Sequence, residues 1–226
     1  MKGNAIVLSA SNLTLAYKNE IIINNASLMA KEGDFIFITG KSGSGKTTLL
    51  KSFFGEFENF GGELYVLFKN MQKISNSELL TLRRKLGIIF QDYKLINELN
   101  VIDNIAMPLK IAGGFNKEQI IKHVDVLLKY VKLQHKAKKY PLELSGGEQQ
   151  RIALARAIIH NPKIIICDEP TGNLDIHSAD IIWQILDAAR KSFNACIIVV
   201  THQIPSKIDF DYRHFHIDDG VLHEFV

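Results

Sequence analysis

Residues 40–47, Gly-Lys-Ser-Gly-Ser-Gly-Lys-Thr, match the phosphate-binding pattern G-x-x-x-x-G-K-[ST] at every specified position. Glycines let successive backbone N–H groups curl around phosphate oxygens without a Cβ in the way, at the start of a helix. In such a loop Lys46 reaches the β- and γ-phosphates, and the Thr47 hydroxyl faces Mg²⁺. An unliganded glycine-rich turn is the alternative, but an apolar run before the loop and a helical pattern after it favour nucleotide binding. The candidate phosphate-binding residues are Gly40, Lys41, Ser42, Gly43, Ser44, Gly45, Lys46, Thr47 and Thr48.

A second candidate is the pair of carboxylates, Asp168 and Glu169, that ends the apolar run 164–167. Adjacent residues at a strand end point in different directions, so two roles are available. Asp168 can hold Mg²⁺ through water, while Glu169 can polarise the water that attacks a γ-phosphate. By itself the pattern is more typical of an acidic turn. Downstream of a phosphate loop, we interpret it as a metal-and-base pair.

A third candidate is the segment 144–151, Leu-Ser-Gly-Gly-Glu-Gln-Gln-Arg, which precedes an apolar helical pattern. Ser145 and Glu148 have capping-box spacing, so we expect a helix to begin there. Gly146 and Gly147 leave its first N–H groups open to a close anion. An ordinary capped helix with no ligand fits the same spacing.

Four short apolar runs have the continuous β-branched or aromatic character of strands that are buried on both faces. Each run leads directly into a residue that can handle a nucleotide, and ligands of open parallel sheets bind outside the carboxyl ends of strands. We therefore expect these residues to meet at one site. The runs are 35–39, 87–90, 164–167 and 197–201, and the residues that follow are Gly40, Gln91, Asp168 with Glu169, and His202.

The remaining pattern predicts an α/β fold: a nucleotide-binding core with a mainly parallel sheet, an N-terminal antiparallel β lobe and an inserted α-helical lobe. In the β lobe we expect separate strands at 5–8 and 13–17. We assign residues 1–226 to one domain. The β lobe is 1–34 with about 60–70, the core is 35–59, 71–91 and 156–226, and the helical lobe is 92–155.

Composition limits the class of protein. The formal net charge of +3 is too small to indicate a nucleic-acid partner, and we expect none. Cys167 and Cys196 lie in apolar runs and are expected to be separate buried thiols. His214, His216 and His223 are expected on the surface, with no metal site. No signal peptide or transmembrane-length run is evident, so we expect a cytoplasmic chain that reaches a membrane only through a partner.

The order of these motifs resembles that of the ATP-binding cassette (ABC) ATPases over the whole chain, and residues 144–151 match the family signature. The resemblance implies a P-loop NTPase (RecA-like) core, ATP as substrate, Mg²⁺ as cofactor, and hydrolysis to ADP and phosphate. It also implies a head-to-tail homodimer with two composite ATP sites, in which one subunit's signature helix faces the nucleotide on the other subunit's phosphate loop.

The resemblance implies specific roles for residues. Glu169 corresponds to the general base and His202 to the γ-phosphate sensor, with Gln91 and Lys46 as further catalytic residues. Thr47, Gln91 and Asp168 correspond to the Mg²⁺ site. Residues with an implied nucleotide contact or coupling role are Tyr17 on adenine, Ser145, Gly146, Gly147 and Glu148 on the partner's nucleotide, and Asp175 between the two sites. Simple packing is the alternative for Tyr17.

Four segments resemble the group that contains FtsE, LolD and MacB: residues 87–92, 101–109, 144–151 and 171–175. Residues 90–92 and the run that ends with 108–113 are most similar to FtsE. That resemblance implies a polytopic, FtsX-like membrane partner, action in cell division and a location on the cytoplasmic face of the bacterial inner membrane. Residues 93–97 and 101–107 would receive the partner's helix. A LolD-like ATPase for lipoprotein release or export is the main alternative, followed by a soluble ABC ATPase acting on ribosomes or DNA, and a P-loop kinase.

Overall fold

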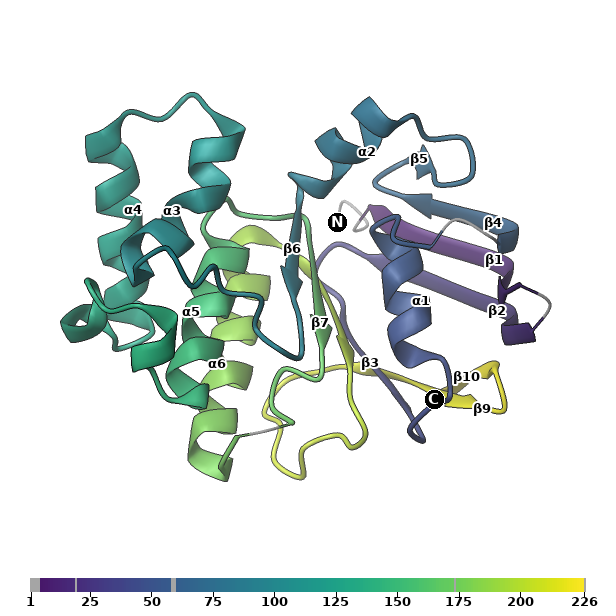
Figure 1. Cartoon of the computed structure of the whole chain (residues 1–226). Helices are drawn as coiled ribbons and strands as arrows, with labels where there is room; N and C mark the ends of the chain where they lie inside the picture. Colours follow the sequence, from purple (N-terminus) through teal and green to yellow (C-terminus); the bar gives the residue numbers. More distant parts are fainter. Residues whose placement is uncertain (1–4, 19, 58–59, 173, 226) are drawn as a thin grey trace.

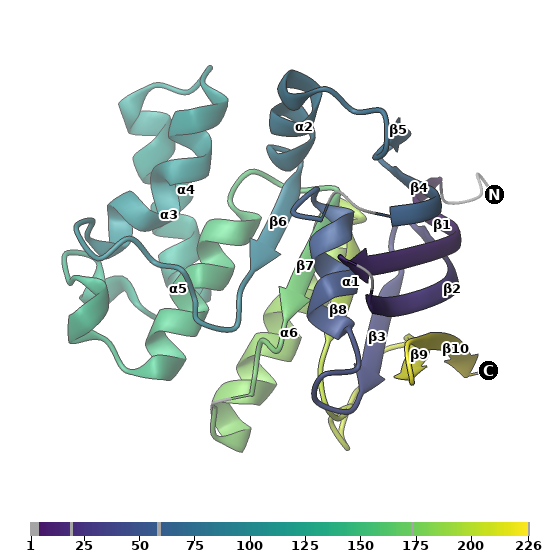
Figure 2. The same cartoon turned by 45° about the vertical axis from the view of Figure 1, so that its right-hand side comes forward.

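The computed structural model describes residues 5–18, 20–57, 60–172 and 174–225. These residues form two β-sheets and the helices that pack against them. Figure 1 shows helices α3 to α6 on one side, the antiparallel sheet on the other, and the central sheet between them. The view in Figure 2 keeps this order. The arrangement confirms the predicted α/β class with a β lobe and a helical lobe.

The central sheet has the strand order β10-β9-β3-β8-β7-β6. Its strands β3, β8, β7 and β6 are the four predicted apolar runs, and they pair in parallel as expected. β9 also pairs in parallel with β3, while β10 is antiparallel to β9. The bounds are β3 (Phe35–Gly40), β6 (Leu86–Ile89), β7 (Ile164–Asp168), β8 (Cys196–Val200), β9 (Arg213–Asp218) and β10 (Val221–Phe225).

Alternate residues of each central strand enter two different cores. In β3, Ile36 and Ile38 pack in the core shared with the β lobe, whereas Phe35 and Phe37 pack in the core under the helical lobe. Successive side chains on a strand point to opposite faces, so a strand buried on both sides must be apolar throughout. This explains why the runs are continuous.

The β lobe is a four-stranded antiparallel sheet in the order β2-β1-β4-β5. The prediction of two separate strands at 5–8 and 13–17 is wrong, because one strand, β1, spans both. Its register with β2 shifts between Ala10 and Leu13, and Asn12 adopts a left-handed φ of 49° there. A β-bulge of this kind breaks the apolar alternation without ending the strand. The bounds are β1 (Ile6–Tyr17), β2 (Glu20–Lys31), β4 (Phe60–Val66) and β5 (Lys69–Asn70).

Three of the helices begin at capping boxes, and the box predicted at Ser145 is one of them. Ser75, Asn116 and Ser145 each form a capping box with the residue three positions later. Within the described ranges, no helix is long and apolar enough to cross a membrane. The bounds are α1 (Lys46–Phe53), α2 (Asn76–Arg83), α3 (Val101–Ala112), α4 (Lys117–Tyr130), α5 (Gly146–Ile158) and α6 (Ile176–Phe193), with short 3₁₀ turns at Gln134–Lys136 and Pro141–Glu143.

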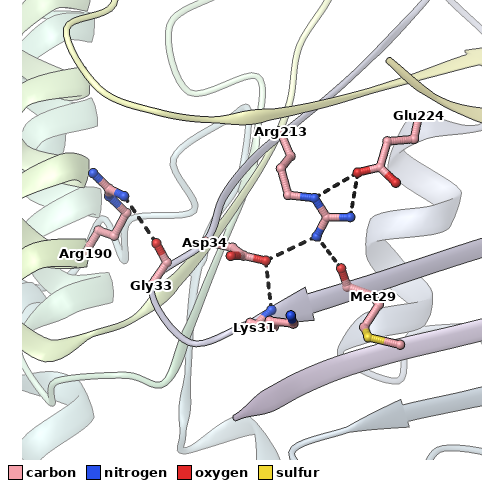
Figure 3. Close-up of polar contacts among 7 residues, drawn as sticks. All are labelled: Met29, Lys31, Gly33, Asp34, Arg190, Arg213 and Glu224. Atoms are coloured by element: carbon pink, nitrogen blue, oxygen red, sulfur yellow. Dashed lines mark hydrogen bonds and ion pairs between the residues drawn. The ribbon is translucent and has the colours of Figure 1, made fainter. Parts of the chain in front are cut away.

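Arg213 joins the β lobe to the central sheet, as Figure 3 shows. Its guanidinium donates to Glu224 Oε1 at 2.6 and 2.8 Å, to Asp34 Oδ2 at 3.2 Å, and to the carbonyl oxygen of Met29. One side chain thus links β9, β10, the end of β2 and the turn before β3. Charge-assisted hydrogen bonds of this kind are stronger than neutral ones.

The C-terminal histidines are only partly as expected. His223 is exposed, but His214 and His216 are half-buried, and both imidazoles contact the Thr39 hydroxyl, at 2.7 and 2.8 Å. Burial, and secondarily the neighbouring His216, lowers the pKa of His214. The surface prediction was wrong for these two because β9 places them beside β3.

Both cysteines are buried free thiols, as predicted. Burial raises the pKa of each thiol, with a smaller contribution in the same direction from Asp168 at Cys167 and from Asp34 at Cys196.

Candidate nucleotide-binding site

The phosphate loop connects β3 to α1 and needs glycine at two places. Gly40 has a φ of 157°, and a Cβ there would lie 2.6 Å from Ser44 Oγ and 2.7 Å from the Ile217 carbonyl oxygen. Gly45 has a φ of 96°, and a Cβ there would lie 2.8 Å from the Ile23 side chain. At Gly40 a side chain would collide with backbone, and at Gly45 the left-handed φ itself disfavours any residue with a Cβ. The loop can therefore bring its backbone N–H groups close to an anion.

Lys46 lies inside the curve of this loop. Its ammonium donates to the carbonyl oxygens of Gly40 and Lys41, each at 2.8 Å, and the residue is 6% exposed. Burial lowers the pKa of Lys46, and the carboxylates Glu169 and Asp168 oppose that shift. The loop thus holds a buried cation whose partners are carbonyl groups of the loop itself, together with two nearby carboxylates.

Ser44 supplies evidence that a ligand fits the loop. Its hydroxyl is buried and has no hydrogen-bond partner among the described residues. Buried polar atoms are nearly always paired, so an unpartnered hydroxyl facing glycine-rich backbone suits a phosphate oxygen. A cleft of about 290 Å³ borders the loop and is lined by residues 20–22, 41–44 and 217–220.

Thr47 and Asp168 form a possible cation site at the ends of α1 and β7. The Thr47 hydroxyl donates to Asp168 Oδ1 at 3.3 Å. Burial raises the pKa of Asp168, while the hydrogen bond from Thr47 and the charges of Lys46 and Lys51 act against that rise. A hydroxyl and a carboxylate are hard oxygen donors of the type that Mg²⁺ prefers, so these residues fit that ion.

Glu169 occupies a strained turn next to His202. Its φ of 48° is left-handed, which is uncommon for a residue other than glycine, and its N–H donates to the carbonyl oxygen of Val200. His202 Nε2 lies 2.8 Å from Glu169 Oε1. The side chain of His202 is half exposed, whereas that of Glu169 is 14% exposed. The carboxylate is thus held at a fixed place with a ring nitrogen beside it.

Three predicted residues lie at the margins of this cluster. Gln91 is exposed just after β6. Tyr17 is exposed at the end of β1, where its ring packs edge-on against Phe57 with centroids 4.8 Å apart. Asp175 caps α6 by accepting from the N–H and hydroxyl of Ser178, which lowers the pKa of Asp175.

The signature segment forms the start of α5. Glu148 N–H donates to Ser145 Oγ at 3.3 Å, and Ser145 N–H donates to Glu148 Oε2 at 2.8 Å. Burial raises the pKa of Glu148, but bonds from Ser145 and Lys136 outweigh it and lower the pKa overall. Figures 1 and 2 both show β6 and β7 between α5 and α1, so α5 lies apart from the phosphate loop of its own chain.

Gln150, to which no role was assigned from the sequence, links α5 to the loop after Glu169. Gln150 is 1% exposed, and its Nε2 donates to the carbonyl oxygen of Pro170 at 2.6 Å. A signal was present: Gln150 shares helical spacing with Leu154 and Ile158, which predicts a polar residue on a buried face.

Comparison with known sequences places this site in context. A family model described as "ABC transporter" matches residues 23–172. The cell division ATP-binding protein FtsE of Bacillus subtilis is 36% identical over 210 residues, which cover 92% of this chain and 90% of the relative. The lipoprotein-releasing system ATP-binding protein LolD of Buchnera aphidicola is 40% identical over 207 residues, covering 89% and 90%.

The methionine import ATP-binding protein MetN of Carboxydothermus hydrogenoformans is 40% identical over 200 residues, covering 88% of this chain and 59% of the relative. This chain thus spans about three fifths of that relative's length.

Two solved structures have the same fold. A dimeric bacterial ABC transporter cassette superposes with a TM-score of 0.87 at 35% identity, covering 95% of this chain and 96% of that one. A dimeric post-hydrolysis state of an ATP-binding cassette bound to ADP and Pi gives a TM-score of 0.86 at 34% identity, covering 96% and 97%.

Proposed function

Because this chain belongs to the ABC transporter family and is an ATPase that hydrolyses ATP to ADP and phosphate, we propose that its turnover transmits force to an FtsX-like membrane protein. The observation that carries the catalytic part is the Glu169–His202 pair, 2.8 Å apart. The pair follows two neighbouring parallel strands, and the charges of Glu169 and Asp168 act on Lys46 of the phosphate loop.

In this proposal the phosphate loop binds ATP through its N–H groups, and Lys46 exchanges its loop carbonyls for phosphate oxygens. Ser44 gives its unpartnered hydroxyl to a phosphate oxygen. Thr47 and Asp168, with Gln91, hold Mg²⁺, which neutralises charge on the phosphates when bound. Tyr17 stacks on adenine.

Glu169 serves as the general base. Its carboxylate accepts a proton from a water molecule whose oxygen forms the new bond to the γ-phosphorus, while the bond to the ADP oxygen breaks. His202 Nε2 lies 2.8 Å from Glu169 Oε1. When ATP binds, its N–H exchanges this carboxylate for a γ-phosphate oxygen, which leaves Glu169 free to accept the proton of water. A base held in a strained left-handed turn is pre-organised for one geometry.

We further propose a head-to-tail dimer. The exposed start of α5, with Ser145, Gly146, Gly147 and Glu148, contacts ATP on the partner's phosphate loop, and Asp175 connects the two sites. Two features support this: the glycines leave helix N–H groups open, and α5 lies apart from the phosphate loop of its own chain.

The identity of the membrane partner is the most specific part of the proposal. Residues 93–97, between β6 and α3, and residues 101–107, in the first half of α3, would receive a cytoplasmic helix of an FtsX-like protein. The location would be the cytoplasmic face of the bacterial inner membrane, with cell division as the output. Similarity to FtsE over nearly its full length supports this. The LolD relative is 40% identical over a similar span and favours lipoprotein release as a second candidate.

The test is to trap the Glu169→Gln variant with ATP, purify it from solubilised membranes and identify its partner. The FtsX-like proposal predicts one kind of four-helix membrane protein with a modest extracytoplasmic domain. Two different partners with large extracytoplasmic domains would contradict it and favour lipoprotein release. Recovery of only ribosomal or DNA-bound material would contradict both. Lys46→Ala, which should not retain ATP, is the control for nucleotide-dependent capture.

A further inference from the structure

Gln150 is a polar side chain that is buried where an apolar one would be expected. It lies one turn into α5, after Gly146 at the helix start, and is 1% exposed. Its Nε2 donates to the Pro170 carbonyl oxygen at 2.6 Å. Its Oε1 is buried with no hydrogen-bond partner in the described part of the chain.

The orientation of this amide follows from its partner. Turned the other way, Oε1 would face the Pro170 carbonyl oxygen at 2.6 Å, and two acceptors repel each other at that distance. The amide therefore satisfies Pro170 and leaves its own oxygen unpaired. A buried unpaired acceptor opposes folding, so stability alone does not explain a glutamine here.

The acceptor belongs to the turn that holds Glu169. Glu169 precedes Pro170, has a φ of 48°, and its N–H donates to the carbonyl oxygen of Val200. The N–H of Gly172 donates back to the Glu169 carbonyl oxygen at 3.3 Å. The turn is thus fixed to β8 on one side and, through Gln150, to α5 on the other. A shift of α5 would pull on Pro170, the residue that follows Glu169.

We propose that Gln150 is a positioning residue that holds the Glu169 turn to the signature helix. The inference rests on the proposed roles of Glu169 and of the head-to-tail dimer. In that dimer the start of α5 meets ATP on the partner, whereas Glu169 acts on ATP of its own chain. The Gln150–Pro170 bond then makes the position of the base depend on occupancy of the other site.

The test compares Gln150→Leu with His160→Leu in the full chain. His160, two residues after α5, is a matched control. Its Nε2 donates to the Leu86 carbonyl oxygen at 3.1 Å, and its Nδ1 is buried without a partner among the residues that the structure describes. The Gln150 variant loses a bond to Pro170, in the turn after β7, whereas the His160 variant loses a bond to Leu86, which begins β6 at the opposite end of the sheet from Glu169. We expect Gln150→Leu to lower kcat at least about tenfold with KM for ATP within about twofold, and His160→Leu to leave both within about twofold.

A kcat for Gln150→Leu within twofold of the native protein would overturn the inference, as would an equal loss in His160→Leu. Glu169→Gln is measured alongside: if it hydrolyses ATP normally, the proposed function fails, and if it is inactive while Gln150→Leu is normal, only the inference fails.

Gln150→Glu provides a second test of the positioning role in case the leucine variant does not fold. An ionised carboxylate repels the Pro170 oxygen, whereas a protonated one can donate to it. Burial raises the pKa of a carboxyl group, so protonation restores the donor as pH falls. We expect kcat of Gln150→Glu, relative to native, to rise between about pH 8 and about pH 6. A constant ratio would contradict the positioning role.

Discussion

The Arg213 cluster and the phosphate site, at opposite ends of the central strands, differ in how completely their polar groups are paired. At the amino edge, Arg213 at the start of β9 bonds to Glu224, Asp34 and the Met29 carbonyl (Figure 3). At the carboxyl edge, Ser44 Oγ has no partner among the described residues, and Glu169 is held in a left-handed turn.

This difference indicates that the Arg213 cluster at the amino edge contributes to stability, whereas the groups at the carboxyl edge contribute to ligand binding and turnover. Paired charges at the amino edge fix the β lobe to the core, and they need no ligand. Strained and unpaired groups at the carboxyl edge oppose folding, and they persist only where the surrounding structure enforces them. Substitutions at the two edges should therefore have opposite signatures: loss of stability at one, and loss of binding or turnover at the other.

The largest effect is expected for Lys46→Ala. Hydrogen bonds to a charged group contribute about 1.5–3 kcal/mol each, so ATP affinity should fall about 100-fold or more. Isothermal titration with ATP measures this. Lys117→Ala, an exposed lysine on α4, should bind ATP as the native protein does. Equal affinities for the two variants would contradict the assignment of Lys46.

At the amino edge, Arg213→Ala should lower the free energy of unfolding by about 2 kcal/mol, because it removes charge-assisted bonds to three segments. Urea denaturation measures this, and kcat of the folded variant should stay within about twofold of native. Arg84→Ala, an exposed arginine, should change stability by less than about 0.5 kcal/mol. A large loss of kcat in Arg213→Ala would show that the edges do not separate in this way.

Two capping boxes provide a matched comparison within the chain. Ser75 caps α2 and Ser145 caps α5, each accepting from the N–H three residues later. Replacing either with alanine should cost about 1 kcal/mol of stability. Only Ser145→Ala should also lower kcat, because only that helix start is proposed to face ATP. If ATP turnover falls equally in both variants, Ser145 has no role beyond its cap.

The smallest effect is expected for Tyr17→Leu. Loss of an aromatic contact worth about 0.5–1.5 kcal/mol should raise KM for ATP about threefold while kcat is unchanged. Tyr65→Leu, another exposed tyrosine of the β lobe, is the control and should leave KM unchanged. An unchanged KM in Tyr17→Leu would favour simple packing against Phe57.

The strands and helices that were predicted correctly depend on residues that lie close together in the sequence. The four apolar runs and the capping residues depend on neighbours within a few positions, and the structure contains these strands and helices. Thr47 with Asp168, and Glu169 with His202, come together because parallel strands end at one edge. Their roles stay predictions.

Long-range contacts explain what was missed. His214 and His216 meet Thr39 about 175 positions earlier in the chain, and Arg213 meets Asp34 across a similar separation. The Gln150–Pro170 bond depends on how α5 packs on the sheet. Separate strands were predicted within β1 because the bulge near Asn12 interrupts its alternation.

The most direct test of the account is ATP binding and turnover by Glu169→Gln. The substitution keeps the size of the side chain and removes its ability to accept a proton, while the phosphate loop is unchanged. We predict a loss of turnover of at least about 100-fold with native affinity for ATP. Turnover near the native rate would show that Glu169 is not the base, and loss of ATP binding would show that binding and hydrolysis are not separable as proposed.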